Sequence, residues 1–183
     1  MNWWLSDSAD PAVRPLADRH YSRQKPGTAR FVPPGRCFVL KTAAADAVWA
    51  TSWPFAEYVR HDWPGAWICS IFRNEGKHLS SDLIREAVAA TRWRWPEVPV
   101  LGMITFVDVE QTRRKRDPGR CFRRAGFIPA HRRDCPWRDG PLLVDCSCDT
   151  RTHGGLFALQ LTPEAMPSAV APSGVQEELQ WTS

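Results

Sequence analysis

The stretch from Trp67 to Trp95 constrains the fold of this chain more than any other part of the sequence. The apolar run from Trp67 to Phe72 is typical of a short buried strand, residues 73–78 are polar and contain a glycine, and the chain from Leu79 onward has helical periodicity. The first backbone N–H groups of such a helix have no intrahelical partners and favour an anion. The stretch therefore predicts a helix start that can hold a phosphate or pyrophosphate group.

The segments around this stretch predict a sheet. Cys37 to Lys41 and Val48 to Ser52 are β-prone runs that predict an antiparallel hairpin with its turn around Asp46. Residues 10–21 predict a helix with a proline in its first turn. Val100 to Val107 is almost continuously apolar, which predicts a central strand covered on both faces.

The second half of the chain adds a helix, a short helix and a strand. Ser80 is the expected N-cap of the first helix, Gly126 is expected to end the short helix, and Leu156 to Leu161 predicts the last strand. This order predicts one α/β (α+β) domain over residues 1–162, with a mixed, mostly antiparallel central sheet flanked by helices. Residues 163–183 are rich in Pro, Ser and Ala, so we expect a flexible tail.

Positive charge is concentrated in one region. The formal net charge is +4, yet residues 111–139 alone hold ten Arg or Lys and three Asp, a net +7, which leaves −3 for the rest of the chain. Such an excess is typical of a nucleic-acid-binding surface, and also of a solvated basic face. The DNA-binding hypothesis would use Arg113, Arg114, Lys115, Arg116, Arg120, Arg123 and Arg124.

The sequence contains no apolar run of about 18 residues, and its N-terminus lacks a basic region followed by an apolar one. We therefore expect a soluble, cytoplasmic protein with no membrane partner, and its six cysteines to be reduced thiols or metal ligands. Four soft donors, which could hold zinc or remain free, follow one another at Cys135, Cys146, Cys148 and His153. Trp53, Trp63 and Trp67 could form a stacking wall for a base, although core packing is the common role of tryptophan.

Two motifs resemble the GNAT acyltransferase superfamily. RNEGKH is similar to the cofactor loop of that family, R/Q-x-x-G-x-G/A, with Arg73 and Gly76 in place and His78 where a small residue is usual. RCFRRAGF is similar to a late GNAT element in which a short helix ends in Gly-Phe, with Cys121 or Phe122 where a tyrosine is frequent. The resemblance covers about residues 36–161 and implies acetyl-CoA as a cofactor, bound at Arg73, Gly76, His78, Ser80 and Ser81.

A narrower resemblance involves RHYSRQ near the N-terminus and the aspartate that ends TFVD. Together they resemble the Mom-type DNA-modification proteins of bacteriophages, a GNAT branch that converts adenine in DNA to a carbamoylmethylated form. The resemblance implies His20, Tyr21 and Asp108 as catalytic positions, acetyl-CoA as donor, and an iron ion.

Each candidate residue also has a structural interpretation. Arg73 could bind phosphate or form a surface salt bridge, and Ser80 and Ser81 could contact a ligand or cap the helix. His20 could accept a proton, bind a metal or cap a helix, with Tyr21 packed beside it. Asp108 at a strand end could be a general base, a metal ligand or the cap of the following turn.

Three functional hypotheses follow. The first is a GNAT-type enzyme that transfers an acetyl-derived group to adenine in DNA, and the second is an acetyl-CoA-dependent N-acyltransferase acting on an amine of a small molecule or protein. The third is a basic DNA-binding accessory protein without enzymatic activity. Salt-sensitive DNA binding and acyl-CoA binding would distinguish them.

Overall fold

A computed structural model describes residues 1–23, 25–32, 35–55, 59, 61–111, 117–130 and 156–175. Within these residues seven strands form one sheet in the order β1-β2-β3-β4-β5-β7-β6. Only β4 and β5 run parallel, and the other neighbours are antiparallel. The strands are β1 (Trp3–Ser6), β2 (Arg36–Thr42), β3 (Ala47–Trp53), β4 (Trp67–Asn74), β5 (Met103–Asp108), β6 (Ile128–Pro129) and β7 (Leu156–Leu161). The predicted α+β class with a mostly antiparallel sheet is confirmed.

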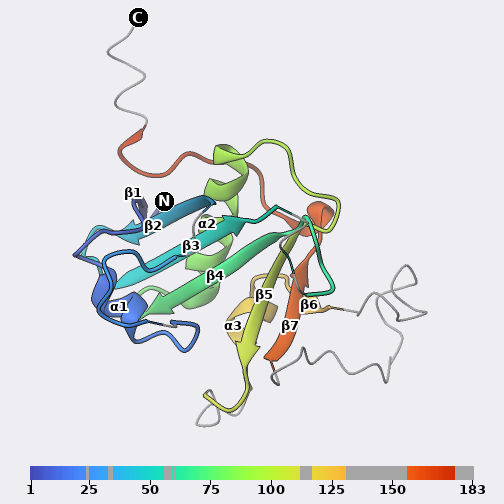
Figure 1. The fold of residues 1–183 in the computed structure, drawn as a ribbon. Coiled ribbons are helices and arrows are strands. Elements are labelled where there is room, and N and C mark those ends of the chain that lie inside the picture. The colour runs from blue at the N-terminus through green and yellow to red at the C-terminus, as the bar shows by residue number, and fades with distance from the viewer. Residues whose placement is uncertain are drawn as a thin grey trace, which may run out of the picture.

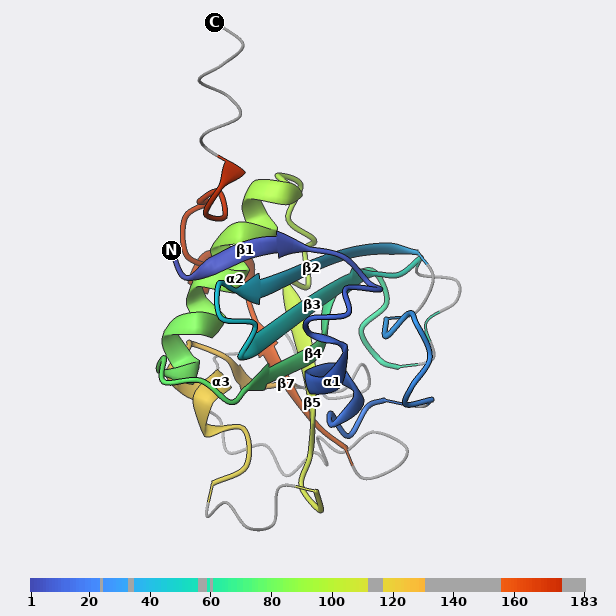
Figure 2. The same ribbon diagram turned by 90° about the vertical axis from the view of Figure 1, so that its left-hand side faces the viewer.

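Helices cover both faces of this sheet. Figures 1 and 2 show α2 (Ser80–Arg94) and α3 (Arg120–Arg124) on one face and α1 (Arg14–Asp18) on the other. Strands β2 and β3 therefore alternate between two cores: Phe38 and Leu40 face α2, whereas Val39 faces α1. Among the described residues no helix is both long and apolar enough to cross a membrane.

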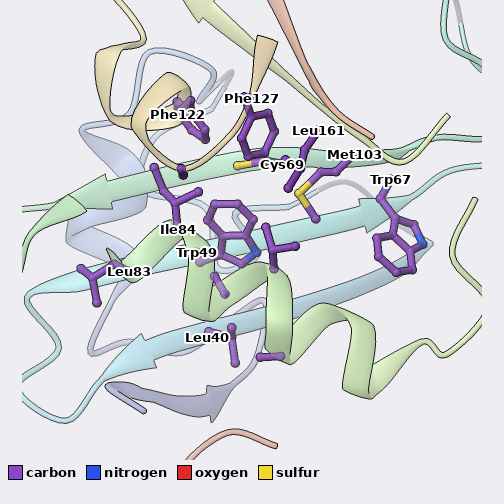
Figure 3. Close-up of a cluster of buried hydrophobic side chains, with 14 of the residues drawn as sticks. Leu40, Trp49, Trp67, Cys69, Leu83, Ile84, Met103, Phe122, Phe127 and Leu161 are labelled. Atoms are coloured by element: carbon purple, nitrogen blue, oxygen red, sulfur yellow. The ribbon is translucent and has the colours of Figure 1, made fainter. Parts of the chain in front are cut away.

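The larger core lies between α2, α3 and the sheet (Figure 3). Trp49 and Trp67 are fully buried there, together with Leu83 and Ile84 of α2 and Met103 of β5. The apolar stripe expected on this helix is the surface that contacts the sheet. Burial of these large side chains is the main contribution to the free energy that holds α2 against the sheet, at about 1.5–3 kcal/mol for each side chain.

The predicted hairpin is present. Strands β2 and β3 pair from Arg36 opposite Trp53 to Lys41 opposite Val48, and the turn between them contains Asp46. Thr42 fixes this turn, because its hydroxyl group donates to Asp46 Oδ1 at 2.6 Å and accepts the backbone N–H of Asp46 at 3.1 Å.

Three elements differ from the sequence prediction. The helix expected over residues 10–21 is only α1, because an earlier start would place Pro15 in the helix interior, where it removes a hydrogen bond and clashes with a carbonyl group. The strand expected from Val100 begins at Met103, since Val100 is 92% exposed. Strand β1 was not predicted, although its residue Trp3 is fully buried.

The structure also differs from expectation at residues 163–175, which the sequence assigned to a flexible tail. A 3₁₀ turn at Pro163–Ala165 leads to Met166, which is buried in the larger core. The segment then crosses α2, where Arg92 donates to the Pro167 carbonyl group at 2.8 Å, and reaches the free edge of β1, where the Ser173 N–H donates to the Trp3 carbonyl group at 2.8 Å. Residues 176–183 lie outside the described residues.

Candidate functional site

Strands β4 and β5 separate after three paired residues. Their ladder joins residues 67–69 to residues 103–105, after which β4 continues beside β3 and β5 continues beside β7 (Figure 1). One extra residue in β4, Ser70, forms a bulge opposite the Ala50–Thr51 step of β3. A bulge bends its strand, which is consistent with the divergence of β4 from β5. The sheet therefore has a gap between two strands near its centre.

The segment 20–22 bridges this gap. The Tyr21 hydroxyl group donates a short hydrogen bond to the Phe106 carbonyl oxygen of β5, and the Ser22 hydroxyl group donates to the Ser70 carbonyl oxygen of β4 at 3.0 Å. The His20 ring stacks on the Tyr21 ring, with 4.3 Å between the centroids. The RHYS motif thus contacts both diverging strands, although it is more than 40 residues away from each in the sequence.

His20 is electrically neutral at neutral pH. Burial, and secondarily the positive charge of Arg73, lower the pKa of His20 from 6.5 to about 4. The ring Nδ1 atom accepts the Ser22 backbone N–H at 3.2 Å and lies 2.7 Å from the Ser22 hydroxyl oxygen, in a contact whose donor depends on the tautomer of the ring. The neutral ring carries one N–H donor and one acceptor nitrogen, so it can accept a proton as a weak base.

Tyr21 remains protonated over the whole neutral range. Burial raises the pKa of its hydroxyl group, the nearby Cys69 and Asp108 raise it further, and a hydrogen bond with the Asp108 backbone acts in the opposite direction. A phenol in this state is a hydrogen-bond donor and not a base. The electrostatic effect of Asp108 on Tyr21 also shows that the two predicted catalytic residues lie close together.

Asp108 ends β5 at the same edge of the gap. Its Oδ1 atom accepts the backbone N–H groups of Glu110 at 2.9 Å and Gln111 at 3.0 Å. Asp108 therefore caps the turn after β5, which was one of the roles proposed from the sequence. Its proximity to Tyr21 leaves the catalytic interpretation open as well. The structure thus brings His20, Tyr21 and Asp108 together.

Arg73 does not extend toward the start of α2. It lies opposite Val48 on the face of the sheet that α1 covers, where its Nε atom is 2.6 Å from Glu75 Oε1 and its Nη1 atom donates to the Arg19 carbonyl oxygen at 2.8 Å. These contacts correspond to the salt-bridge interpretation of this residue. The guanidinium group is engaged on the opposite face from α2 and is not part of an anion cradle.

Gly76 is required by a close approach to the hairpin turn. A Cβ atom at this position would lie 2.3 Å from Asp46 Oδ2, a distance that side chains do not tolerate. The neighbouring Glu75 N–H donates to the Asp46 carbonyl oxygen at 2.8 Å, and the Gly76 N–H donates to Asn74 Oδ1 at 2.9 Å. The glycine of the RNEGKH motif therefore has a packing role against β2 and β3.

The start of α2 retains the properties of an anion site. The helix is capped by Leu79 and not by the predicted Ser80, whose hydroxyl group accepts a hydrogen bond from Asn74 Nδ2 at 3.0 Å. Within the described part of the chain, the backbone N–H groups of residues 77–81 donate to no other group. The His78 side chain is exposed, whereas Ser81 is buried.

The described part of the basic region lies on α3. Arg120 and Arg124 are exposed, while Arg123 pairs with Asp117 and also donates to the Pro118 carbonyl oxygen at 3.0 Å. Several predicted residues lie outside the described residues: Arg113, Arg114, Lys115, Arg116, Cys135, Cys146, Cys148 and His153. In the part that the structure describes, no three His, Cys, Asp or Glu side chains are grouped in a way that could hold a metal ion.

Sequence reasoning missed Ser22, Ser70 and Glu75. Ser22 belongs to the RHYS motif, but its contact is with a backbone carbonyl group, for which no sequence signal exists. A bulge at Ser70 likewise has no clear signature in an apolar run. Glu75 had a weak sequence signal, because it is an acidic residue two positions after Arg73, at the end of a predicted strand.

Comparisons of the chain with models of known protein families, with curated proteins and with solved structures found no match. The resemblance to GNAT and Mom-type proteins therefore rests on the sequence motifs.

Proposed function

We propose that this protein is a GNAT-type transferase that attaches an acetyl-derived group to the amino group of a DNA base, adenine in particular. The observation that supports the proposal is the convergence of His20, Tyr21 and Asp108 at the gap between β4 and β5. The only parallel strand pair of the described sheet opens at this place, and open strand ends of mixed sheets commonly bind ligands. A set of polar side chains from two distant segments at such a position is typical of an active site.

The residues at the gap suit the transfer of a group to an amine. The amine must lose a proton as its nitrogen forms the new bond, and His20 is neutral at pH 7, so it can accept that proton. Asp108, whose charge acts on the Tyr21 hydroxyl group, adds a carboxylate to the same site. Tyr21 supplies a hydrogen-bond donor whose pKa stays above the working pH.

The start of α2 fits the phosphate groups of acetyl-CoA. The N–H groups of residues 77–81 have no other partner among the described residues, and the dipole of this 15-residue helix favours negative charge at that end. Ser80 would add a hydroxyl group, whereas Arg73 does not fit because its guanidinium group is bound to Glu75 and Arg19. When bound, acetyl-CoA would supply a thioester whose carbonyl carbon is open to attack by an amine, while the C–S bond breaks and CoA leaves as the thiol with the proton that the amine gives up.

An iron or zinc ion has no comparable support in the described residues. His20 and Asp108 offer one nitrogen and one carboxylate, and no group of three donors is present around them in the part of the chain described. The proton transfer and hydrogen bonding described above come from the protein side chains at the gap.

DNA as the substrate is supported by the position of α3. Arg85 of α2 donates to the Arg124 carbonyl oxygen, so the exposed arginines of α3 are attached to the first turns of α2. Positive charge beside the proposed cofactor site would hold the phosphate backbone of DNA and make binding depend strongly on salt. A base inside duplex DNA would also have to flip out of the helix to reach the gap.

Mass spectrometry of nucleosides from cells that produce the protein tests this function. We expect a modified deoxyadenosine with the parent chain and its absence with His20→Gln. Unmodified nucleosides together with acetylated small molecules or proteins would support the N-acyltransferase alternative. DNA binding without acetyl-CoA binding would support the accessory-protein alternative, and either result would contradict the proposed function.

A further inference from the structure

We propose that Glu75 is a positioning residue that holds the His20–Ser22 segment over the gap between β4 and β5. The inference deepens the proposed function, because it concerns the same site, but its structural part can be tested without any activity. It also gives the RNEG sequence a role other than phosphate binding. Arg73, Glu75 and Gly76 would together connect the hairpin turn to the segment that carries His20 and Tyr21.

Glu75 joins two arginines that come from different parts of the chain. Its Oε1 atom accepts Arg19 Nε at 3.0 Å and Arg73 Nε at 2.6 Å, and its Oε2 atom accepts Arg19 Nη2 at 2.7 Å. Arg73 closes the arrangement, since its Nη1 atom donates to the backbone carbonyl oxygen of Arg19 at 2.8 Å. Both the side chain and the backbone of Arg19 are therefore attached to the end of β4.

This attachment acts on the residue directly before His20. Arg19 is the C-cap of α1, a helix of five residues that is too short to hold the following segment by itself. On the far side of the segment, Arg23 pairs with Asp18 at 2.8 Å and donates to the Arg30 carbonyl oxygen at 2.8 Å. Two of the three residues between these anchors, Tyr21 and Ser22, hydrogen-bond to β5 and β4.

Glu75 is itself fixed to the hairpin. Its backbone N–H donates to the Asp46 carbonyl oxygen at 2.8 Å, and the absence of a Cβ atom at Gly76 allows the loop to approach the Asp46 carboxylate. The position of the carboxylate is therefore set by β2 and β3, which belong to the interior of the sheet. A rigid anchor of this kind can fix the position of a short loop segment such as residues 19–23.

Glu75 also pairs with the arginine whose charge acts on the His20 ring. The positive charge of Arg73 contributes to the lowered pKa of His20, and the Glu75 carboxylate pairs with both Arg73 and Arg19. The arginines lower the pKa of Glu75 to about 2, so the carboxylate is ionised wherever the protein is folded and near neutral pH. On the other side of the segment, the Asp18 carboxylate pairs with Arg23 at 2.8 Å.

The test compares Glu75→Gln with Glu86→Gln as a matched control. Glu86 also receives two hydrogen bonds from the N-terminal part of the chain, from the backbone N–H of Asn2 at 2.6 Å and from its Nδ2 atom at 2.9 Å, but it has no contact with residues 19–23. The chain labelled with ¹⁵N-histidine gives ring signals for five histidines, and His20→Gln identifies the signal of His20. Amide hydrogen exchange of residues 20–23 is measured on the same variants.

In Glu75→Gln we expect the His20 ring signal to move or broaden as its stacking on Tyr21 is lost, and the amides of residues 20–23 to exchange at least about tenfold faster. In Glu86→Gln the His20 ring signal and the exchange rates of residues 20–23 should match those of the parent chain. Arg19→Gln should reproduce the effect. The double variant Arg19→Gln/Glu75→Gln should have no larger effect than either single variant, because both single changes break the same contact between Arg19 and Glu75. Arg19→Gln changes only an exposed side chain, so it provides the answer even if Glu75→Gln folds poorly.

An unchanged His20 signal and unchanged exchange in both Glu75→Gln and Arg19→Gln would overturn the inference. If the parent chain modifies DNA bases, Glu75→Gln should lower the rate at least about fivefold with unchanged affinity for DNA, since positioning affects the reaction step. If the parent modifies no base, the proposed function fails while the magnetic-resonance and exchange results still decide the role of Glu75.

Discussion

The Tyr21 hydroxyl group donates a hydrogen bond to the backbone carbonyl oxygen of Phe106, which lies 85 residues further along the chain. This contact attaches the N-terminal segment to the side of β5 from which β4 has separated. The segment therefore occupies a place where a continuous sheet would have a backbone ladder.

Tyr21→Phe should reduce both stability and activity. The change keeps the ring that stacks on His20 but removes the donor to the Phe106 carbonyl oxygen, which should cost about 1 kcal/mol of unfolding free energy. Urea unfolding measures this loss, and His20 ring signals should stay in place if stacking is retained. Under the proposed function, base modification should fall at least about tenfold. Parental activity in Tyr21→Phe would show that the Tyr21 hydroxyl group has no role in the reaction.

Protonation of His20 should destabilise the protein between pH 6.5 and pH 4. The folded-state pKa of about 4 lies below the ordinary value of 6.5, so the unfolded chain binds the proton first and stability is lost as the pH falls. At pH 5 the loss should be about 1–2 kcal/mol relative to pH 7, after allowance for partial exposure of the ring. His20→Gln should lack this part of the pH dependence.

The measurement at pH 5 also separates His20 from Glu75. The pKa of Glu75 is lowered from 4.5 to about 2 by its two arginine partners, so its contribution is present above pH 4.5 and is lost only as the pH falls from there towards 2. A parental pH dependence in His20→Gln would show that another group titrates in the range from 4 to 6.5.

Gly76→Ala should destabilise the protein through Asp46. The new methyl group would lie 2.5 Å from Asp46 Cγ, and relief of this overlap should cost about 1–3 kcal/mol. In the background of Asp46→Ala, which has lost the carboxylate, the same glycine replacement should cost less. Thermal or urea unfolding of the four chains gives the coupling free energy, and equal costs in both backgrounds would contradict the packing role of Gly76.

Met166→Ala should destabilise the chain by about 2–4 kcal/mol, because this side chain is 6% exposed and belongs to the larger core. Val170→Ala is a suitable control, since Val170 is 44% exposed and should change stability by less than about 0.5 kcal/mol. Similar small effects at both positions would show that residues 163–175 are not held against α2 in solution.

Neutralisation of arginines on α3 should affect DNA binding unequally. Arg124→Gln should lower the slope of log affinity against log salt by about one, as expected for one phosphate contact, because this side chain is exposed. Arg123→Gln should have a smaller effect, since Arg123 already pairs with Asp117. Fluorescence anisotropy with labelled duplex DNA between low and high salt measures both, and unchanged slopes would place the DNA contact away from α3.

Much of the secondary structure could be predicted from the sequence because it depends on local patterns. Runs of apolar, β-prone residues identified β2 and β3, and helical spacing from Leu83 to Thr91 identified α2. The catalytic hypothesis also named His20, Tyr21 and Asp108 in advance, although only through a resemblance. By contrast, the four-residue β1 was missed, because so short an alternation carries little information.

The sequence by itself determined the type of fold: the strand, loop and helix from Trp67 to Trp95, the hairpin before them and the apolar strand after them dictate a mixed sheet with α2 packed on it. Only the tertiary structure decided what the RNEG residues contact, because the face of Arg73 and the partner of Glu75 depend on where α1 packs. The gap between β4 and β5 is likewise a property of the assembled sheet. The ladder between these two strands ends after Cys69 and Thr105, beside the bulge at Ser70 in the β3–β4 pairing, and residues 20–22 reach the gap only in the folded chain.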